Sequence, residues 1–218
     1  MTLDFAKARE TMVEQQVRPW DVLDARVLEV LSALPREAFV ADAHRTLAYA
    51  DLALPIGHGE VMMKPVVEGR MLQALALQPD EEALEIGTGS GFIAACLGRL
   101  ARAVVSVELH ADLAAAARAR LDAQGLGGNI EVVTADALAW QNARRFDAVC
   151  VTGAVDTLPP RFLGWLRPGG RLFVVRGRAP AMEAVLLRPH SGGMRTESLF
   201  ETELPYLAGA APVPEFKL

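Results

Sequence analysis

Three glycines at alternate positions, in "LEIGTGSGF", directly follow an apolar segment: Gly87, Gly89 and Gly91. Glycine permits tight turning and close approach of the backbone to a ligand, and the first turn of a helix offers unpaired N–H groups. Glu108 lies 21 residues beyond Gly87, at the end of "VVSVE", where its carboxylate can accept hydrogen bonds from two ribose hydroxyls. Together these residues predict a site for an adenosine-containing cofactor.

Two types of cofactor compete for this site. A dinucleotide site expects G-x-G-x-x-G, but the sixth position counted from Gly87 is Phe92, and counting from Gly89 satisfies only the looser form that ends in Ala94. Glu85 stands just before the turn. A carboxylate there would repel a pyrophosphate, whereas it attracts the cationic sulfonium and ammonium of S-adenosylmethionine. The pattern therefore favours S-adenosylmethionine, with S-adenosylhomocysteine as product.

A third acid completes the predicted cofactor site. Asp136 in "VVTADAL" ends a further apolar segment, where it can accept a hydrogen bond from an adenine amino group, cap a following helix, or do both. The residues predicted to bind the cofactor are Glu85, Gly87, Thr88, Gly89, Ser90, Gly91, Glu108, Leu109, Asp136, Ala137 and Thr152.

Short apolar strands alternate with helices after residue 80. "EALEIG", "AVVSVE", "NIEVVTAD", "FDAVCVTGA" and "GGRLFVVRG" read as strands, with helices expected at about 91–100 and 111–124. This alternation predicts an α/β fold with a doubly wound, Rossmann-like sheet that is mostly parallel. "AVLLRPHSGGMRTESLFETEL" predicts a C-terminal antiparallel hairpin about its Ser-Gly-Gly turn. We expect two parts, an N-terminal helical extension with a glycine-hinged loop (1–79) and the cofactor-binding core (80–218).

The N-terminal part reads as helices joined by that loop. Apolar residues recur at helical spacing in "DVLDARVLEVLSAL", with Asp21 as the expected N-cap and Pro35 as the end. The stripe consists of Val22, Leu23, Val27, Leu28, Val30 and Leu31. A second helix is predicted from Pro65 to Leu77, and "LPIGHGEVMMKPVV" lies between the two.

Composition limits the classes of partner. The 218 residues are 51% hydrophobic and 22% charged, and the net charge of −5 indicates no broad binding to nucleic acid. Cys96 and Cys150 stand in apolar runs without neighbouring ligands, so we expect buried reduced thiols and no metal site. We find no signal-peptide pattern and no window of membrane-spanning length, and we therefore expect a cytoplasmic protein without a membrane partner.

With these residues in place, the sequence resembles the protein-L-isoaspartate O-methyltransferase family of class I S-adenosylmethionine-dependent methyltransferases. "VLEVLSALPREAFV" and "AYADLALPIGHGE" are similar to family segments that generic methyltransferases lack. "LEIGTGSGF", "VVSVE", "FDAVCVTGA" and "LRPGGRLFVVRG" follow in the family's order and spacing. The resemblance implies a protein or peptide substrate and methyl transfer to the α-carboxylate of an isoaspartyl residue. Such a carboxylate, with a pKa of about 4, is already ionised at neutral pH and needs no general base.

The resemblance breaks down at the loop. The family has Gln-Thr-Ile-Ser-Gln-Pro after its Gly-x-Gly, and its threonine, serine and backbone N–H groups line the methyl-transfer site. This chain has Glu60, Val61, Met62, Met63, Lys64 and Pro65 there. The threonine and serine positions thus carry no hydroxyl, and each donor lost to a charged group typically costs about 1.5–3 kcal/mol. Ala137 likewise replaces a family glycine.

Each loop residue has a structural and a functional interpretation. Lys64 can pair with an anionic substrate or be a solvated residue before the helix. Met62 and Met63 can contact the cofactor or fill the core. His58 reads as a loop residue rather than a catalyst, and Trp20 can cap the site or pack. The substrate-loop candidates are His58, Gly59, Glu60, Val61, Met62, Met63 and Lys64.

Three alternatives to the isoaspartyl methyltransferase remain. The replaced loop favours the first, a methyltransferase of the same scaffold with another substrate. The second is a protein that binds S-adenosylmethionine without catalysis, and the third and most remote is a dehydrogenase.

Overall fold

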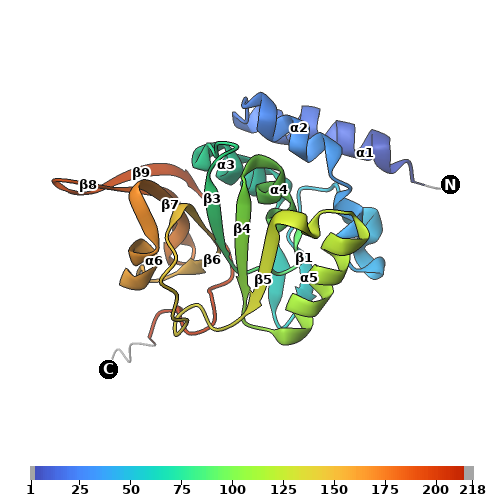
Figure 1. The fold of residues 1–218 in the computed structure, drawn as a ribbon. Helices are drawn as coiled ribbons and strands as arrows, with labels where there is room; N and C mark the ends of the chain where they lie inside the picture. The colour runs from blue at the N-terminus through green and yellow to red at the C-terminus, as the bar shows by residue number, and fades with distance from the viewer. Residues whose placement is uncertain (1–2, 214–218) are drawn as a thin grey trace, which may run out of the picture.

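A seven-stranded sheet forms the centre of the molecule (Figure 1), and the computed structural model describes residues 3–213. The strand order is β5-β4-β3-β6-β7-β8-β9. Strands β3 to β7 are parallel, whereas β8 and β9 run antiparallel. The strands are β3 (Glu82–Ile86), β4 (Ala103–Glu108), β5 (Ile130–Thr134), β6 (Phe146–Val155), β7 (Leu166–Arg178), β8 (Ala181–His190) and β9 (Gly193–Glu201). The predicted fold is confirmed, including the hairpin, in which His190 pairs with Gly193.

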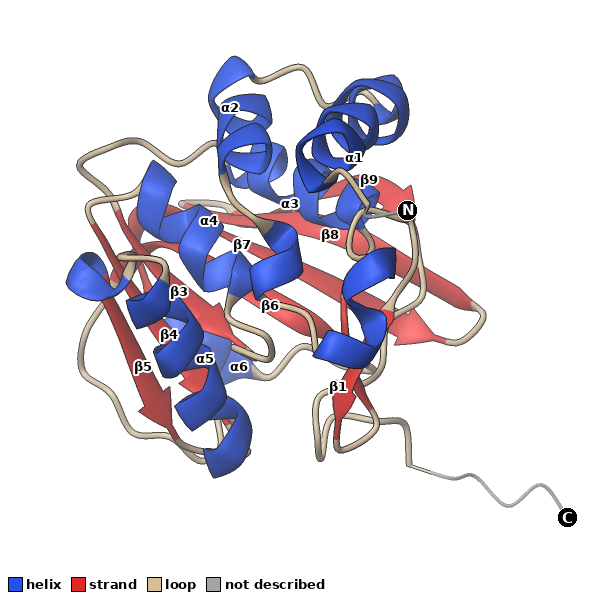
Figure 2. Ribbon diagram, turned by 90° about the vertical axis from the view of Figure 1, so that its right-hand side faces the viewer, coloured by secondary structure: helices blue, strands red, loops and turns tan. Residues whose placement is uncertain are grey.

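Helices cover both faces of this sheet. On one face lie α3 (Pro65–Leu75), α4 (Phe92–Leu100) and α5 (Ala111–Ala123), seen together in Figure 2. They contribute Leu72, Leu97 and Leu121 to one hydrophobic core. On the other face, the short helix α6 (Pro160–Gly164) places Phe162 in a second core. The inner parallel strands β3, β4 and β6 are therefore buried on both faces, as in a doubly wound sheet, whereas β5 at the edge is partly exposed.

The N-terminal helices lie over α3 and α4 (Figure 1). They are α1 (Phe5–Met12) and α2 (Ala25–Ala33). The ends of the two predicted parts, residues 1–2 and 214–218, lie outside the described residues. Within residues 3–213, no helix is long and apolar enough to cross a membrane, and no group of three or more metal-ligating side chains could hold a metal ion. Cys96 and Cys150 are buried and free, as predicted.

The predicted start of helix α2 is wrong. Asp21 has a φ of 59° and ends a short 3-10 turn, and the N-cap of α2 is Asp24, whose carboxylate accepts the N–H of Arg26 at 2.8 Å. The side chain of Gln73 fixes this entry, because its Oε1 accepts the N–H groups of Leu23 and Asp24 at 2.6 and 2.9 Å. Leu23 is consequently exposed instead of lying on the apolar stripe. The helix ends before Pro35, as predicted.

The glycine-hinged loop is a small antiparallel hairpin of β1 (Leu54–Gly57) and β2 (Glu60–Met62). Its turn has three consecutive residues with positive φ, namely Gly57 at 105°, His58 at 55° and Gly59 at 81°. Such a turn is open mainly to glycine, which explains the Gly-x-Gly pattern. Helix α3 begins at Pro65, as predicted, but it ends before Leu77 because Ala76 adopts a left-handed φ of 45°.

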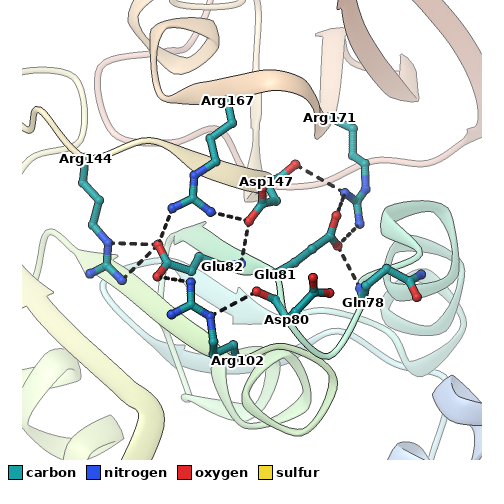
Figure 3. Close-up of polar contacts among 9 residues, drawn as sticks. All are labelled: Gln78, Asp80, Glu81, Glu82, Arg102, Arg144, Asp147, Arg167 and Arg171. Atoms are coloured by element: carbon teal, nitrogen blue, oxygen red, sulfur yellow. Dashed lines mark hydrogen bonds and ion pairs between the residues drawn. The ribbon is translucent and has the colours of Figure 1, made fainter.

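A network of ion pairs joins the amino ends of the parallel strands (Figure 3). Glu82 of β3 pairs with Arg102, Arg144 and Arg167, at 2.8, 3.4 and 2.7 Å. Arg167 also reaches Asp147 of β6 at 2.5 Å, and the carboxylate of Asp147 accepts the N–H of Glu82. Burial pushes the pKa of Glu82 upward, but the three arginines outweigh that effect and hold it below its usual value. The network thus links neighbouring strands at their amino ends, at the opposite end of the sheet from the glycine turn.

Replacing Glu82 with glutamine should lower the free energy of unfolding by about 1–3 kcal/mol at neutral pH, because three arginines lose a shared charge. The lowered pKa means that this stabilisation is complete above pH 4.5, the usual carboxyl value, and is lost as the pH falls through the folded value. Denaturant titrations at neutral pH and at about pH 3 check this, since the gap between wild type and variant should shrink in acid. Glu183→Gln, which removes one half-exposed ion pair with Arg176, is the control and should have little effect.

Candidate active site

A cleft of about 660 Å³, counting its open mouth, lies at the carboxyl ends of β3, β4 and β6. This is the position at which doubly wound sheets bind ligands. The lining comes from the hairpin, the end of β3 with the glycine turn, the ends of β4 and β6, the segment after β5, the start of α5 and the C-terminal segment. The residues are Ile56, Glu60, Val61, Ile86, Gly87, Gly89, Val107, Glu108, Leu109, His110, Leu113, Ala135, Asp136, Ala137, Leu138, Thr152, Gly153, Leu207 and Ala208.

The glycine turn leaves no room for side chains. A Cβ on Gly87 would lie 2.5 Å from Oγ1 of Thr152, and a Cβ on Gly89 would lie 2.9 Å from Cδ1 of Ile56. Both glycines also have positive φ, 95° and 51°. The Thr152 hydroxyl donates to the carbonyl of Ile86 at 2.9 Å and to that of Gly87 at 2.6 Å, so it holds the turn against β6. Backbone rather than side chain therefore forms this wall of the cleft.

Glu108 ends β4 and lines the cleft with a buried carboxylate. One oxygen accepts the N–H of Gly89 at 2.8 Å, and the other accepts the N–H of His110 at 3.0 Å. A carboxylate has about four acceptor positions, so two remain for hydroxyl groups. The same side chain fixes the glycine turn and offers acceptors to a ribose.

Asp136 lies at the other side of the cleft, after β5. Its Oδ1 accepts the N–H of Leu138 at 2.8 Å and thereby caps a turn. The helix that the sequence allowed after Asp136 is a turn instead. Leu109 and Ala137, which directly follow Glu108 and Asp136, also line the cleft, and Leu109 is half-exposed.

A smaller inner chamber adjoins the cleft and shares four of its residues, Val61, Gly87, Gly89 and Thr152. The other residues that line the chamber are Met62, Met63, Glu68, Glu85, Thr88, Ser90 and Ile93. Met62 and Met63 are buried in the core, as one interpretation predicts, and they also line this chamber, so that their contact with a cofactor stays a prediction. The chamber thus combines an apolar wall from β2 with acids from β3 and α3.

Glu85 is fully buried at the chamber, and its electrostatics are unusual. Burial raises the pKa of its carboxyl to about 8, although the hydroxyl of Ser106 opposes the shift by donating to it, and the charge of Glu108 adds to it. Thr88 extends this chain through a hydrogen bond to Ser106. Oε1 of Glu85 has no hydrogen-bond donor within residues 3–213. A cation in the chamber would satisfy that oxygen and favour the ionised form.

The tip of the hairpin contacts the start of α5. The ring of His58 stacks on that of His110, with centroids 3.9 Å apart and planes 9° apart. Nε2 of His58 also lies 2.9 Å from a carboxylate oxygen of Asp112, at the start of α5. His58 and Gly59 do not line the cleft, whereas Glu60 and Val61 of the next strand do. Burial raises the pKa of the half-buried Glu60, which the nearby His110 counteracts.

Besides His58 and Gly59, three residues considered for the site, Gly91, Lys64 and Trp20, line neither the cleft nor the chamber. Gly91 caps α4, where a Cβ would lie 3.2 Å from that of Ala117, so it serves helix packing. Lys64 is exposed and borders a separate groove with Trp20 and Arg70.

Several residues of the site carried no recognisable signal in the sequence. Ile56 reaches the cleft because of the hairpin, and Leu207 does so because its segment docks on β6 through the bridge between Ala154 and Tyr206. His110 and Leu113 lie two and five residues after Glu108, so the position of the acid could have pointed to them. Glu68 could not be recognised from the sequence, because it stands among the apolar residues of a predicted helix.

The residues present fit S-adenosylmethionine. The turn is a cradle that a Cβ would fill, Glu108 has free acceptor positions, and the unpartnered oxygen of Glu85 suits a cationic group. A pyrophosphate has no N–H donor for the unpartnered oxygen of Glu85, and the carboxylate of Glu108 would repel it.

Comparison with known proteins agrees with this geometry. The family model described as "Protein-L-isoaspartate(D-aspartate) O-methyltransferase (PCMT)" matches residues 7–190. The chain belongs to this family. A protein-L-isoaspartate O-methyltransferase of Methylorubrum extorquens is 42% identical over 195 residues, which cover 89% of this chain and 85% of the relative. Another of Syntrophobacter fumaroxidans is 39% identical and covers 90% and 92%.

Two solved structures share the fold. One is a Plasmodium falciparum protein described as a protein-L-isoaspartate O-methyltransferase, crystallised with S-adenosyl-L-homocysteine. It has a TM-score of 0.79 and 17% identity, and the match covers 94% of this chain and 99% of that one. The other, a protein-L-isoaspartate O-methyltransferase, has a TM-score of 0.80 and 23% identity, with 93% and 66% covered. The PCMT fold thus extends over nearly the whole chain.

Replacing Glu108 with alanine should weaken S-adenosylhomocysteine binding roughly 10–100-fold, because hydroxyl groups lose a charged acceptor. Titration calorimetry measures the affinity, and the melting temperature shows whether the fold survives the loss of the contact with Gly89. Glu131→Ala, on the exposed side of β5, is the control. Unchanged affinity in a folded Glu108 variant would refute the ribose role.

Breaking the contacts at the tip of the hairpin should make the cofactor dissociate faster, because the hairpin contributes Ile56, Glu60 and Val61 to the wall of the cleft. His58→Ala and Asp112→Asn should each have a modest effect, since the pair is solvent-exposed. Stopped-flow displacement of S-adenosylhomocysteine measures the rate. Equal dissociation rates for both variants and wild type would show that the hairpin does not restrain the ligand.

Proposed function

We propose that the protein transfers a methyl group from S-adenosylmethionine to a carboxylate of damaged aspartyl residues in protein or peptide substrates. The observation that carries the proposal is the cleft at the carboxyl ends of the strands, where the glycine turn and Glu108 meet Glu60 and Val61 of the loop. Family membership over residues 7–190 supports the same reaction.

The chemistry asks little of acid–base groups in the protein. S-adenosylmethionine, when bound, supplies a methyl group that is already activated by the sulfonium. The substrate carboxylate is ionised at neutral pH, so alignment and exclusion of water provide most of the catalysis. Glu108 and Asp136 would hold the adenosine part, while Val61, Met62 and Met63 would keep the chamber dry.

A buried arginine holds the substrate loop in place. Nη2 of Arg36 donates to the carbonyl of Met63 at 2.6 Å, and Nε donates to the carbonyl of Ala48 at 2.7 Å. The loop backbone is therefore positioned without the hydroxyl side chains at residues 61 and 63. We further propose that residues 1–79 supply the substrate-facing part and residues 80–218 the cofactor-binding core.

A second candidate function rests on the apolar wall of the chamber. Val61 and Met63 offer no hydroxyl donor to a substrate carboxylate, and Glu60 places an acid at the edge of the cleft. These side chains suit a less anionic or more apolar methyl acceptor. The candidate is a methyltransferase of the same scaffold with a different substrate.

Methyl transfer to an isoaspartyl peptide distinguishes the two. We expect base-labile label from S-adenosylmethionine on the isoaspartyl peptide and none on the matched aspartyl peptide. Met63→Ser, which restores the family's hydroxyl beside the chamber, should lower KM for the peptide because a donor to its carboxylate is gained.

No label on either peptide from wild-type protein that binds the cofactor would reject isoaspartyl methylation. Label that appears only with Met63→Ser would show that the loop has been adapted to another acceptor. Equal labelling of both peptides would refute specificity for damaged residues.

A further inference from the structure

One buried carboxylate at the inner chamber has no role in the site described above. Glu68 lies in the first turns of α3, is 1% exposed, and lines the chamber together with Met63 and Glu85. Its Oε2 pairs with Nη1 of Arg36, which is fully buried. Its Oε1 has no hydrogen-bond donor among residues 3–213. Because an unsatisfied buried carboxylate oxygen is costly, this atom calls for an explanation.

Arg36 is not a partner of Glu68 alone. The guanidinium divides its donors among three acceptors, since it also binds the carbonyls of Ala48 and Met63. Burial raises the pKa of the Glu68 carboxyl, Arg36 opposes that shift, and the charge of Asp51 adds to it. The carboxylate is thus only partly compensated by its protein neighbours, and a further cation at the chamber would complete the compensation.

The position of the chamber indicates which end of a ligand would reach it. The cleft and the chamber meet at Gly87 and Gly89, with Glu108 and Asp136 lining only the cleft. An adenosine group held by these two acids would therefore have room for its 5′ substituent in the chamber beside the glycine turn. In S-adenosylmethionine and S-adenosylhomocysteine, that substituent ends in an α-ammonium and a carboxylate.

We propose that Glu68 binds the α-ammonium group of the cofactor and forms, with Glu85, the acidic lining of the chamber. This inference rests on the cofactor assigned under the proposed function. An ammonium group has three N–H donors, so it can satisfy more than one carboxylate oxygen at once. Arg36 then has two positioning roles, because it holds Glu68 and the backbone of Met63 in one hydrogen-bonded group.

The test compares two ligands that differ in one group, S-adenosylhomocysteine and its analogue without the α-amino group. Neither has a sulfonium, so the comparison isolates the ammonium. In titration calorimetry, wild type should prefer S-adenosylhomocysteine. Glu68→Gln should weaken that ligand roughly 10–100-fold, as for loss of a charged hydrogen bond, and leave the analogue unchanged. Glutamine keeps the volume of the side chain and an acceptor for Arg36.

Glu37→Gln is the matched control, because Glu37 is a buried carboxylate that accepts from Tyr49 outside the chamber. It should leave the preference between the two ligands as in wild type. Glu68→Asp retains the charge and should retain part of the preference, which provides a second variant if Glu68→Gln fails to fold by its melting curve.

Two results would overturn the assignment of Glu68. An equal loss of affinity for both ligands would show a general effect on the site, and no loss for either would show that Glu68 only neutralises Arg36. Wild-type protein that bound neither ligand would instead refute the proposed cofactor, and the Glu68 role with it.

Discussion

The buried guanidinium of Arg36 is the contact on which the arrangement of the site depends. An unpaired charge in the interior is very costly, so the surrounding chain must supply partners. Those partners come from separate segments: the carbonyl of Ala48, the carbonyl of Met63 and the carboxylate of Glu68. The guanidinium also lies over the ring of Phe92, 4.9 Å from its centroid, at the start of α4. One side chain from the N-terminal region thereby places the loop, α3 and the helix after the glycine turn relative to one another.

The two ends of the sheet differ in how their charges are compensated. At the amino ends of the strands, Glu82 is surrounded by arginines, and its pKa is held low (Figure 3). At the carboxyl ends, Glu85 is buried without a cationic partner, and its pKa rises to about 8. The first arrangement stabilises the fold by itself, whereas the second leaves a buried acid whose ionisation depends on a cationic ligand. The charges at the amino ends of the strands therefore stabilise the fold, and those at the carboxyl ends suit ligand binding.

Sequence patterns predicted the parts of the structure that depend on local chemistry. The glycine turn requires backbone conformations that other residues rarely adopt, and Glu108 follows its strand at a fixed spacing, so both could be read directly. The start of α2 could not, because the side chain of Gln73, some fifty residues away, decides between Asp21 and Asp24. Leu207 likewise enters the cleft through a tertiary contact with β6. Long-range contacts, rather than weak local signals, account for the differences.

The loop illustrates how a scaffold can keep its shape while its side chains change. The backbone at Met63 is held through its carbonyl, which any residue at that position would provide. The turn before it is held by the backbone conformations of Gly57 and Gly59 and by the contacts of His58 with α5. None of these constraints depends on the identity of residues 61 and 63. Hydroxyl groups can therefore be exchanged for apolar ones there without disturbing the backbone of the loop, and family membership constrains the fold and cofactor of this chain more tightly than its substrate.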